Sequence, residues 1–220
     1  NMAVDLANIG RTQEVTGDFS SAEATYREAL QIRERLGDAP GAARVRAAIG
    51  DVRNQLGALD EAQQHYEAAL ETLGPEDDPL MFSRLLANLG TLAHKRGNYT
   101  GAVDLCRRSL QIKERLGDER GRATVLGNLG NPLAALGRTD EAEASYRAAI
   151  ALAETLGDAQ TLAHQSWNLG CFLEEQGRLA EAVPLVERSV RWCEEVGHVQ
   201  LAERRSTLDD IRLRLHPGVC

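Results

Sequence analysis

The stretch ATVLGNLGNPLAALGRTDEAEASYRAAIALAETLGD, residues 123–158, returns along the chain with a period of 40 residues. Its two glycines and its first helix-facing alanine have counterparts in every copy. Gly130 corresponds to Gly10, Gly50, Gly90 and Gly170, Gly137 to Gly17, Gly57, Gly97 and Gly177, and Ala142 to Ala22, Ala62, Ala102 and Ala182. A fixed period in this range is typical of a solenoid built from stacked repeats.

Each copy contains two amphipathic helical patterns. In the first, the leucines from Leu126 to Leu136 recur at spacings of three and four residues, which places them on one face of a helix. Gly137 is expected to end that helix as a left-handed cap. The second pattern runs from there to Gly157, which ends it in the same way. The repeat is therefore predicted to be a hairpin of two helices, called helix A and helix B below.

The start of helix B is predicted from capping residues. Asp140 is expected to cap it, and Glu143, three residues later, would complete a capping box. The same arrangement recurs as Ser20 with Glu23 and as Asp60 with Gln63.

The glycine in the middle of helix A needs a physical reason, because glycine inside a helix costs about 1 kcal/mol relative to alanine. We expect close approach: with no side chain on Gly130, helix B can place Ala142 almost against the backbone of helix A. Neither helix can bury its apolar stripe alone, so neighbouring repeats supply the core.

These residues resemble the tetratricopeptide repeat family, and the 40-residue length is similar to that of kinesin light chains and LGN-type G-protein modulators. The residues that carry the resemblance in the quoted copy are Leu126, Leu129, Gly130, Ala142, Tyr146 and Ala149. The resemblance implies an all-α fold, a right-handed α-α superhelix (TPR solenoid) of five helical hairpins plus a C-terminal capping helix.

The pattern predicts a single TPR domain over residues 1–220. The repeats are expected at 1–37, 38–77, 78–117, 118–157 and 158–197, with the capping helix at 199–215. We expect that helix to bury its apolar side and to cover the other side with solvated charges, namely Arg204, Arg205, Asp209, Arg212 and Arg214. Arg205 with Asp209 and Asp210 with Arg214 have the spacing of stabilising pairs on one helix.

Composition narrows the function classes. The formal net charge of −8 argues against nucleic acid or an anionic membrane as the main partner. No apolar run is long enough to span a membrane, and the four cysteines form no metal-ligand spacing, so no cofactor is expected. We expect reduced thiols in a cytoplasmic protein, and the predominance of arginine over lysine is typical of GC-rich bacterial genomes.

The helix A side chains that are not used in packing are expected to line a concave groove. In the fourth repeat these are Thr124, Gly127, Asn128, Asn131 and Ala135. The ionisable members of the groove at related positions are Arg11, Arg44, Asp51, Arg84, His94, Lys95, His164, Glu174 and Glu175.

An asparagine precedes the Leu-Gly pair in four repeats, as Asn8, Asn88, Asn128 and Asn168. Asparagine is a mediocre helix former, so its recurrence needs a reason. One interpretation is that its amide binds the backbone of an extended peptide; the resemblance to kinesin light chains, LGN-type proteins and carboxylate-clamp relatives implies that this position lines the groove. The other is a structural hydrogen bond between neighbouring A helices, and the two are compatible.

Charge divides the expected groove. Its first half is basic, whereas Glu174 and Glu175 make the far end acidic, so a peptide with acidic groups toward the first three repeats would fit; an ordinary solvated face is the alternative. The predicted peptide-binding residues are Asn8, Arg11, Arg44, Arg84, Asn88, Lys95, Asn128, Asn131, His164 and Asn168.

An enzymatic function is disfavoured. The nearest candidate pair, His164 and Cys171, is separated by seven residues, or roughly 10 Å along a helix. The sequence favours a scaffold that binds an extended peptide or a partner's tail. The alternatives are a ligand-sensing module of a signalling or transcription regulator and a homodimerisation module.

Overall fold

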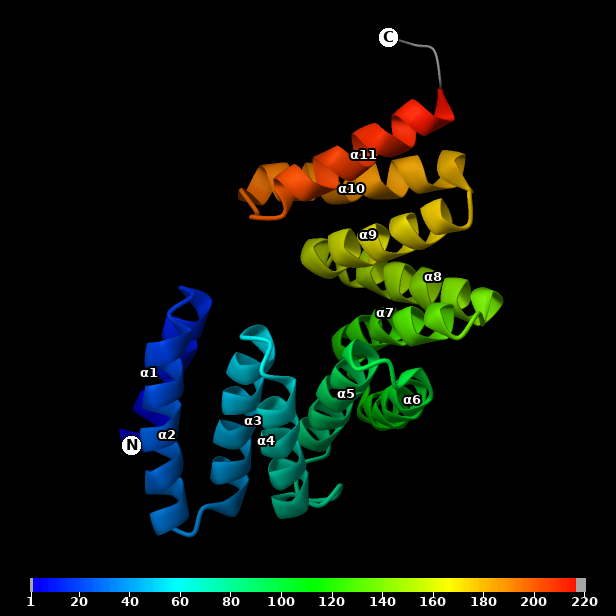
Figure 1. The fold of residues 1–220 in the computed structure, drawn as a ribbon. Coiled ribbons are helices and arrows are strands. Elements are labelled where there is room, and N and C mark those ends of the chain that lie inside the picture. Colours follow the sequence, from blue (N-terminus) through cyan, green and yellow to red (C-terminus); the bar gives the residue numbers. More distant parts are fainter. Residues whose placement is uncertain (1, 217–220) are drawn as a thin grey trace. The chain divides into compact units, whose positions relative to one another are not determined.

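The computed structural model describes residues 2–216, which form eleven α-helices and, within that range, no strand (Figure 1). The helices are α1 (Met2–Val15), α2 (Phe19–Arg35), α3 (Ala39–Gln55), α4 (Leu59–Thr72), α5 (Pro79–Lys95), α6 (Tyr99–Leu116), α7 (Glu119–Ala135), α8 (Thr139–Leu156), α9 (Ala159–Glu175), α10 (Leu179–Val196) and α11 (Leu201–Leu215). They fall into two compact units, unit 1 up to Ile112 and unit 2 from Lys113 onward.

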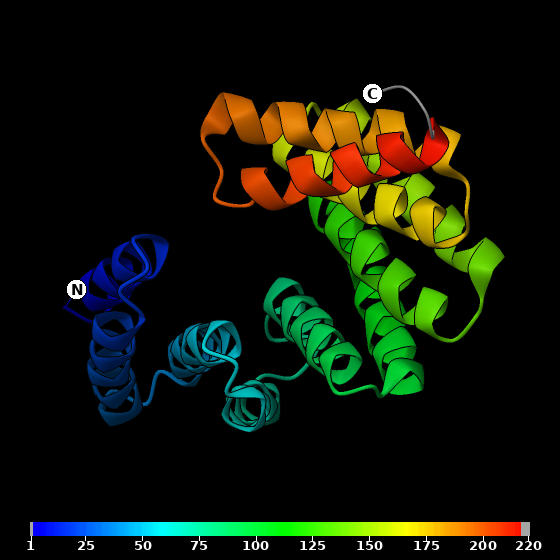
Figure 2. The ribbon, with the colours of Figure 1, turned by 45° about the horizontal axis from the view of Figure 1, so that its top comes forward.

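Consecutive helices pair as hairpins within each unit. In unit 1, α1 packs on α2 and α3 on α4, and in unit 2, α7 packs on α8 and α9 on α10 (Figures 1 and 2). The remaining pair is α5 with α6, and in unit 1 Gly90 of α5 lies against Cys106 of α6. The predicted all-α architecture of five hairpins and a final helix is therefore confirmed. We call α1, α3, α5, α7 and α9 the A helices and their partners the B helices.

The glycine after each A helix ends it as predicted. Gly137 has a left-handed φ of 70°, and the N–H groups that follow α7 return to its last turn, with Arg138 N 2.9 Å from Leu133 O. This six-residue closure satisfies a terminal carbonyl and reverses the chain at once.

The predicted caps of the B helices are wrong because of this tight turn. Helix α8 already begins at Thr139, after Arg138, and α4 begins at Leu59, so Asp140 and Asp60 lie inside the first turn. There their carboxylates face the positive end of the helix dipole but cap nothing. In α2 the cap is Asp18, whose carboxylate accepts from Ser21 N at 3.1 Å, and not Ser20.

The glycine in each A helix does permit close approach, but the side chain that comes nearest lies one turn after the predicted alanine, and at Gly10, Gly50 and Gly130 it is a tyrosine. A Cβ on Gly50 would lie 2.6 Å from the ring of Tyr66, and one on Gly10 would lie 2.7 Å from the ring of Tyr26. Gly130 faces the ring of Tyr146 in the same way. The tyrosine lies one helical turn after the alanine on the same side of helix B, and its longer side chain reaches the gap first.

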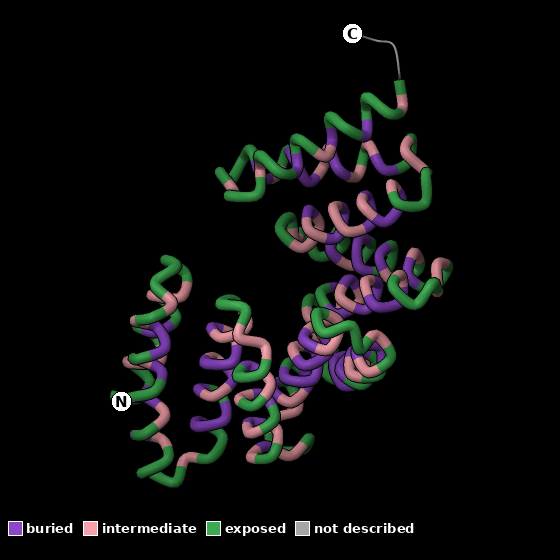
Figure 3. The backbone as a smooth tube through the Cα atoms, viewed as in Figure 1, coloured by how far each residue is buried: buried purple, intermediate pink, exposed green. Residues whose placement is uncertain are grey.

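The core of each unit lies between successive hairpins. In unit 1, Tyr26 and Ala29 of α2 pack against Val45, Ile49 and Val52 of α3. Figure 3 shows buried residues recurring along the inner sides of the hairpins while the turns are exposed. Stacking of neighbouring repeats therefore supplies the buried surface that one hairpin lacks.

The connection from the second to the third hairpin, residues 73–78, is longer than the other connections between described helices. Helix α4 ends at Thr72, and α5 starts at Pro79, whose missing N–H is harmless in the first turn. Asp78 caps α5 by accepting from Met81 N at 3.0 Å.

The last helix differs from its prediction in three details. It begins at Leu201 instead of residue 199. Arg204, expected on the solvent side, is buried, because it lies at the position of an A helix that faces the preceding hairpin. Arg205 pairs with Glu194 of α10 at 2.7 Å and not with Asp209, whereas the predicted pair of Arg214 with Asp210 is present at 3.2 Å.

Candidate binding surface

The predicted groove residues of the first three repeats lie on the A helices of unit 1. Together with Glu14 of α1, which was not predicted, we call them the unit 1 A-surface: Asn8, Arg11, Glu14, Arg44, Asp51, Arg84, Asn88 and Lys95. Hydrogen bonds join the three helices across it. Gln55 of α3 donates to Glu14 of α1 at 3.0 Å, and Lys95 of α5 donates to Asn54 of α3 at 2.7 Å. These bonds place the side chains of successive A helices next to one another.

A half-buried carboxylate, Asp51, organises the middle of this surface. Oδ1 of Asp51 accepts from the Tyr66 hydroxyl at 2.7 Å and from Asn88 Nδ2 at 2.8 Å. Burial raises the pKa of Asp51, against the opposite effect of the Tyr66 hydrogen bond. Asn88 therefore makes the structural bond between A helices that was one of the two interpretations of the recurring asparagine. This bond uses only its NH₂ group.

The tyrosines that fill the glycine gaps thus reach the A-surface, which the sequence interpretation missed. The Tyr26 hydroxyl donates to Glu14 at 3.1 Å, and the Tyr146 hydroxyl donates to Asn131 at 2.6 Å. Burial is the main cause of the raised pKa of each tyrosine. A tyrosine 16 residues after Gly10, Gly50 and Gly130, with a polar residue one or four positions after that glycine, was the signal available in the sequence.

The cations of the unit 1 A-surface are exposed, and they differ in how they are held. Arg44 forms an ion pair with Asp78 at 2.6 Å, and Arg11 donates to Asn8 at 3.2 Å. Arg84 is exposed and, among residues 2–216, makes no hydrogen bond or ion pair, although its charge acts on nearby Asp51. Arg84 is therefore the cation of this surface with most freedom to meet a partner.

The remaining predicted residues lie on the A helices of unit 2. We call Asn128, Asn131, His164 and Asn168 the unit 2 A-surface; all four are half-buried. Asn168 donates to Gln165 Oε1 at 3.2 Å, and Asn131 accepts from Tyr146.

One predicted groove position in unit 2 is closed. Gly127 is buried, and the side chain of Gln165 occupies the space that a Cβ would need. The reason is that α9 packs closely against α7 at this point. Thr124 and Ala135, predicted for the same groove, are exposed.

Both predicted histidines are packed against aromatic rings. The ring centroid of His94 lies 5.4 Å from that of Tyr99, and the centroid of His164 lies 5.4 Å from that of Trp192. Burial lowers the pKa of His94 and is the first cause of the lowered pKa of His164. Neither is an isolated solvent-facing cation.

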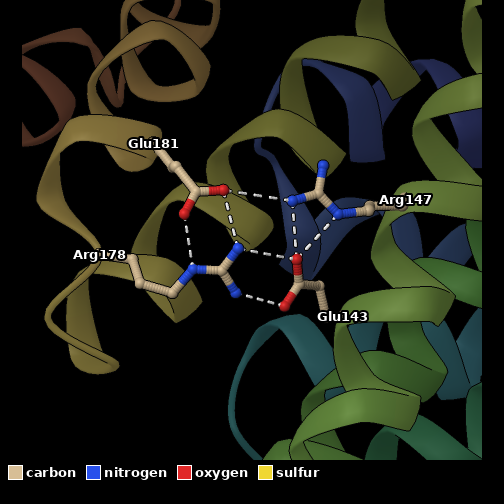
Figure 4. A network of polar contacts seen from close by, with 4 residues as sticks. All are labelled: Glu143, Arg147, Arg178 and Glu181. Atoms are coloured by element: carbon tan, nitrogen blue, oxygen red, sulfur yellow. Dashed lines mark hydrogen bonds and ion pairs between the residues drawn. The ribbon is translucent and has the colours of Figure 1, made fainter.

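The densest ion-pair network lies on the B-helix side of unit 2 (Figure 4). Arg178 pairs with Glu143 at 2.5 Å and with Glu181 at 2.7 Å, and Arg147 pairs with Glu143 at 2.7 Å. The hydrogen bond from Arg178 is the main cause of the lowered pKa of Glu143. This network ties α8 to α10 and leaves the A-surface untouched.

The cysteines offer little chemistry. Cys106, Cys171 and Cys193 are free thiols, and burial raises the pKa of Cys106 to about 12. In the described part of the chain no group of histidine, cysteine or acidic side chains could hold a metal ion. No described helix is long and apolar enough to cross a membrane.

Comparison with known proteins decides the family. A tetratricopeptide repeat profile matches residues 2–73 and 82–155, and a second one matches residues 128–192. The chain belongs to the tetratricopeptide repeat family. This confirms the resemblance inferred from Gly130, Ala142 and Tyr146, and it supports a protein–protein interaction scaffold. Among curated proteins, none matches this chain.

Solved structures show the same fold at low sequence identity. The chain is similar to BtubC from P. vanneervenii (18% identity, 92% of this chain and 93% of that chain, TM-score 0.66). It is similar to MamA (17% identity, 86% of this chain and 96% of that chain, TM-score 0.56). It also resembles aspartyl phosphate phosphatase F from Bacillus subtilis (14% identity, 96% of this chain and 59% of that chain, TM-score 0.70). The chain spans little more than half the length of that protein.

Proposed function

We propose that the protein is an interaction scaffold that binds an extended peptide or a partner's tail along the unit 1 A-surface. Acidic side chains of the partner lie against Arg11, Arg84 and Lys95. The carbonyl oxygen of Asn88 and the amide of Asn8 bind the peptide backbone, since an asparagine side chain offers both donors and acceptors.

The observation that carries this proposal is an imbalance between satisfied acids and available cations. Glu14 accepts from Tyr26 and Gln55, and Asp51 accepts from Tyr66 and Asn88. Arg84 stands exposed beside them with no internal partner among the described residues. The acids of the surface are held by the fold, so its cations remain to recruit a partner, although the chain as a whole has a formal charge of −8.

The unit 2 A-surface is proposed to contact a less charged stretch of the partner. Asn128, Asn131, His164 and Asn168 present amides and a half-buried imidazole, and the neighbouring Glu174 is engaged with Arg214 at 2.5 Å. Groups of this kind suit backbone and neutral side chains better than acidic ones.

The test is selection of random 15-residue peptides displayed on phage, followed by affinity measurement of the enriched peptides. We expect enrichment of Asp and Glu, and a dissociation constant raised at least about tenfold (1.4 kcal/mol) in Arg11→Gln/Arg84→Gln. The matched control is Arg27→Gln/Arg35→Gln, which removes two exposed arginines of α2, a B helix of the same unit. Equal losses in the two variants would show non-specific charge attraction and overturn the proposal.

A second candidate is the sensing module of a larger regulator. The likeness to RapI (16% identity, 86% of this chain and 53% of that chain, TM-score 0.67) and to aspartyl phosphate phosphatase F favours it, since this chain spans only part of each. An effector domain encoded in the same gene would support this candidate. Homodimerisation is a further prediction, which light scattering of the purified chain tests directly.

A further inference from the structure

The connection between α10 and α11 carries an aromatic and histidine cluster. His198 lies in this connection, with its ring centroid 5.3 Å from that of Trp192 and 6.0 Å from that of His164. Three structural elements therefore meet through these rings: α9, α10 and the start of the final helix. Backbone N–H of Gln200 donates to Nδ1 of His198 at 3.3 Å, which uses the lone pair of a neutral imidazole.

A buried cation stands beside the cluster. Arg204 of α11 is buried, with its guanidinium carbon 5.2 Å from the ring centroid of Trp167. It donates to Ser189 Oγ and, at 2.9 Å, to Gln200 Oε1. Within residues 2–216 no carboxylate pairs with it. Buried charges are normally paired with an opposite charge, so this junction already holds uncompensated positive charge.

We propose that α11 is a pH-sensitive cap, released from α9 and α10 when His164, packed against Trp192 and His198, becomes protonated next to Arg204. Release occurs as the pH falls from about 6.5 toward about 5, the range in which histidine acquires its charge. It uncovers Trp167 and the side of α10 that carries Ser189, and it opens the end of unit 2 to a new contact.

Charges on the surrounding elements support this direction. Burial is the first cause of the lowered pKa of His164, followed by Arg204 and His198, while Asp158 acts the other way. Asp158 forms an ion pair with Arg120 of α7 at 3.0 Å, which reduces its stabilising effect on a protonated His164. A histidine whose pKa is lower when docked than when free binds more protons in the free state, so docking weakens as the pH falls.

Two glutamates near this end of unit 2 are already paired. Glu154 of α8 is engaged with Arg188 of α10 at 2.7 Å, and Glu194 of α10 with Arg205 of α11 at 2.7 Å. Neither glutamate is free to neutralise a new imidazolium. Exposed pairs of this kind hold α11 only weakly, since each contributes about 0–1 kcal/mol.

The chain provides its own probe, because its only two tryptophans, Trp167 and Trp192, both lie at this junction. Titrating the full chain from pH 8 to pH 5, we expect tryptophan emission to shift to longer wavelength. Amide hydrogen exchange of α11, corrected for the intrinsic pH dependence, should accelerate at least tenfold while that of α8 stays constant.

The variant His164→Gln/His198→Gln should lose both changes, because glutamine keeps a polar side chain that cannot be protonated. The matched control, His65→Gln/His94→Gln in unit 1, should keep them. A transition that persists in His164→Gln/His198→Gln would overturn the proposal. So would hydrogen exchange of the unaltered chain that accelerates equally in α8 and α11, or in neither, a result that does not depend on any variant folding.

Discussion

The hairpins α3–α4 of unit 1 and α7–α8 of unit 2 share a glycine–tyrosine contact and differ in the group that accepts the hydrogen bond of the tyrosine. In both, a tyrosine of the B helix fills the gap left by a glycine of the A helix, Tyr66 at Gly50 and Tyr146 at Gly130. In both, its hydroxyl donates to the residue after the glycine. That residue is Asp51 in the first hairpin and Asn131 in the second.

The difference teaches that packing and surface chemistry are set separately. The glycine–tyrosine contact is a matter of space and recurs at Gly10, Gly50 and Gly130, so it belongs to the fold. The acceptor varies between a carboxylate, Asp51, and an amide, Asn131, while the glycine–tyrosine contact stays the same. Substitutions that exchange these features test the separation.

The largest loss of stability is expected when a Cβ is added to a glycine that faces a tyrosine ring. Gly50→Ala or Gly130→Ala drives a Cβ into the tyrosine ring and should lower the free energy of unfolding by about 2 kcal/mol, even after the helix-propensity gain. Gly90→Ala is the control: its Cβ would lie 2.9 Å from the Cys106 thiol, the end of a small side chain, so the loss should stay below about 1 kcal/mol. Urea denaturation measures all three, and a Gly130→Ala variant as stable as Gly90→Ala would contradict the account.

The next effect separates the two acceptors. Tyr66→Phe removes a donor from a half-buried carboxylate and should cost about 2 kcal/mol, whereas Tyr146→Phe removes a donor from an amide and should cost about 1 kcal/mol. The same denaturation series measures both. Equal costs would mean that the charge of Asp51 has no bearing on this bond.

The smallest effect is a pH dependence confined to unit 1. Because burial raises the pKa of Asp51 above its ordinary 3.8, the folded state holds the proton more tightly, and the contribution of this group to stability falls as the pH rises through that window. Asp51→Asn gives the hairpin the neutral acceptor of α7–α8. Its stability relative to the unaltered chain should rise as the pH increases above 3.8, because only the unaltered chain loses this contribution there. A difference that does not vary with pH would contradict this.

The sequence predicted the elements of the fold well because they depend on short-range rules. The period of 40 residues and the left-handed glycine that ends each A helix are features of this kind. The caps of the B helices were predicted at the wrong residues because the connection at Gly137 is shorter than expected. Its length depends on backbone hydrogen bonds that the sequence does not show.

The candidate site was predicted only as a list of positions. The register of the A helices located Asn88 and Arg84 on one surface, but it could not show that Asn88 is tied to Asp51 while Arg84 is free. It also misjudged Gly127 and Arg204, both buried by contacts with a neighbouring helix. Such contacts involve residues of another repeat, and the sequence of a single repeat does not show which residues of the next one lie close to it.

The most direct test of the proposed binding surface is a chemical-shift map by two-dimensional amide NMR, using a peptide selected on the unaltered chain. We predict that the largest shifts on titration fall on α1, α3 and α5, around Asn8, Arg11, Arg84 and Asn88. Shifts concentrated instead on the B helices α2 and α4 would contradict the account.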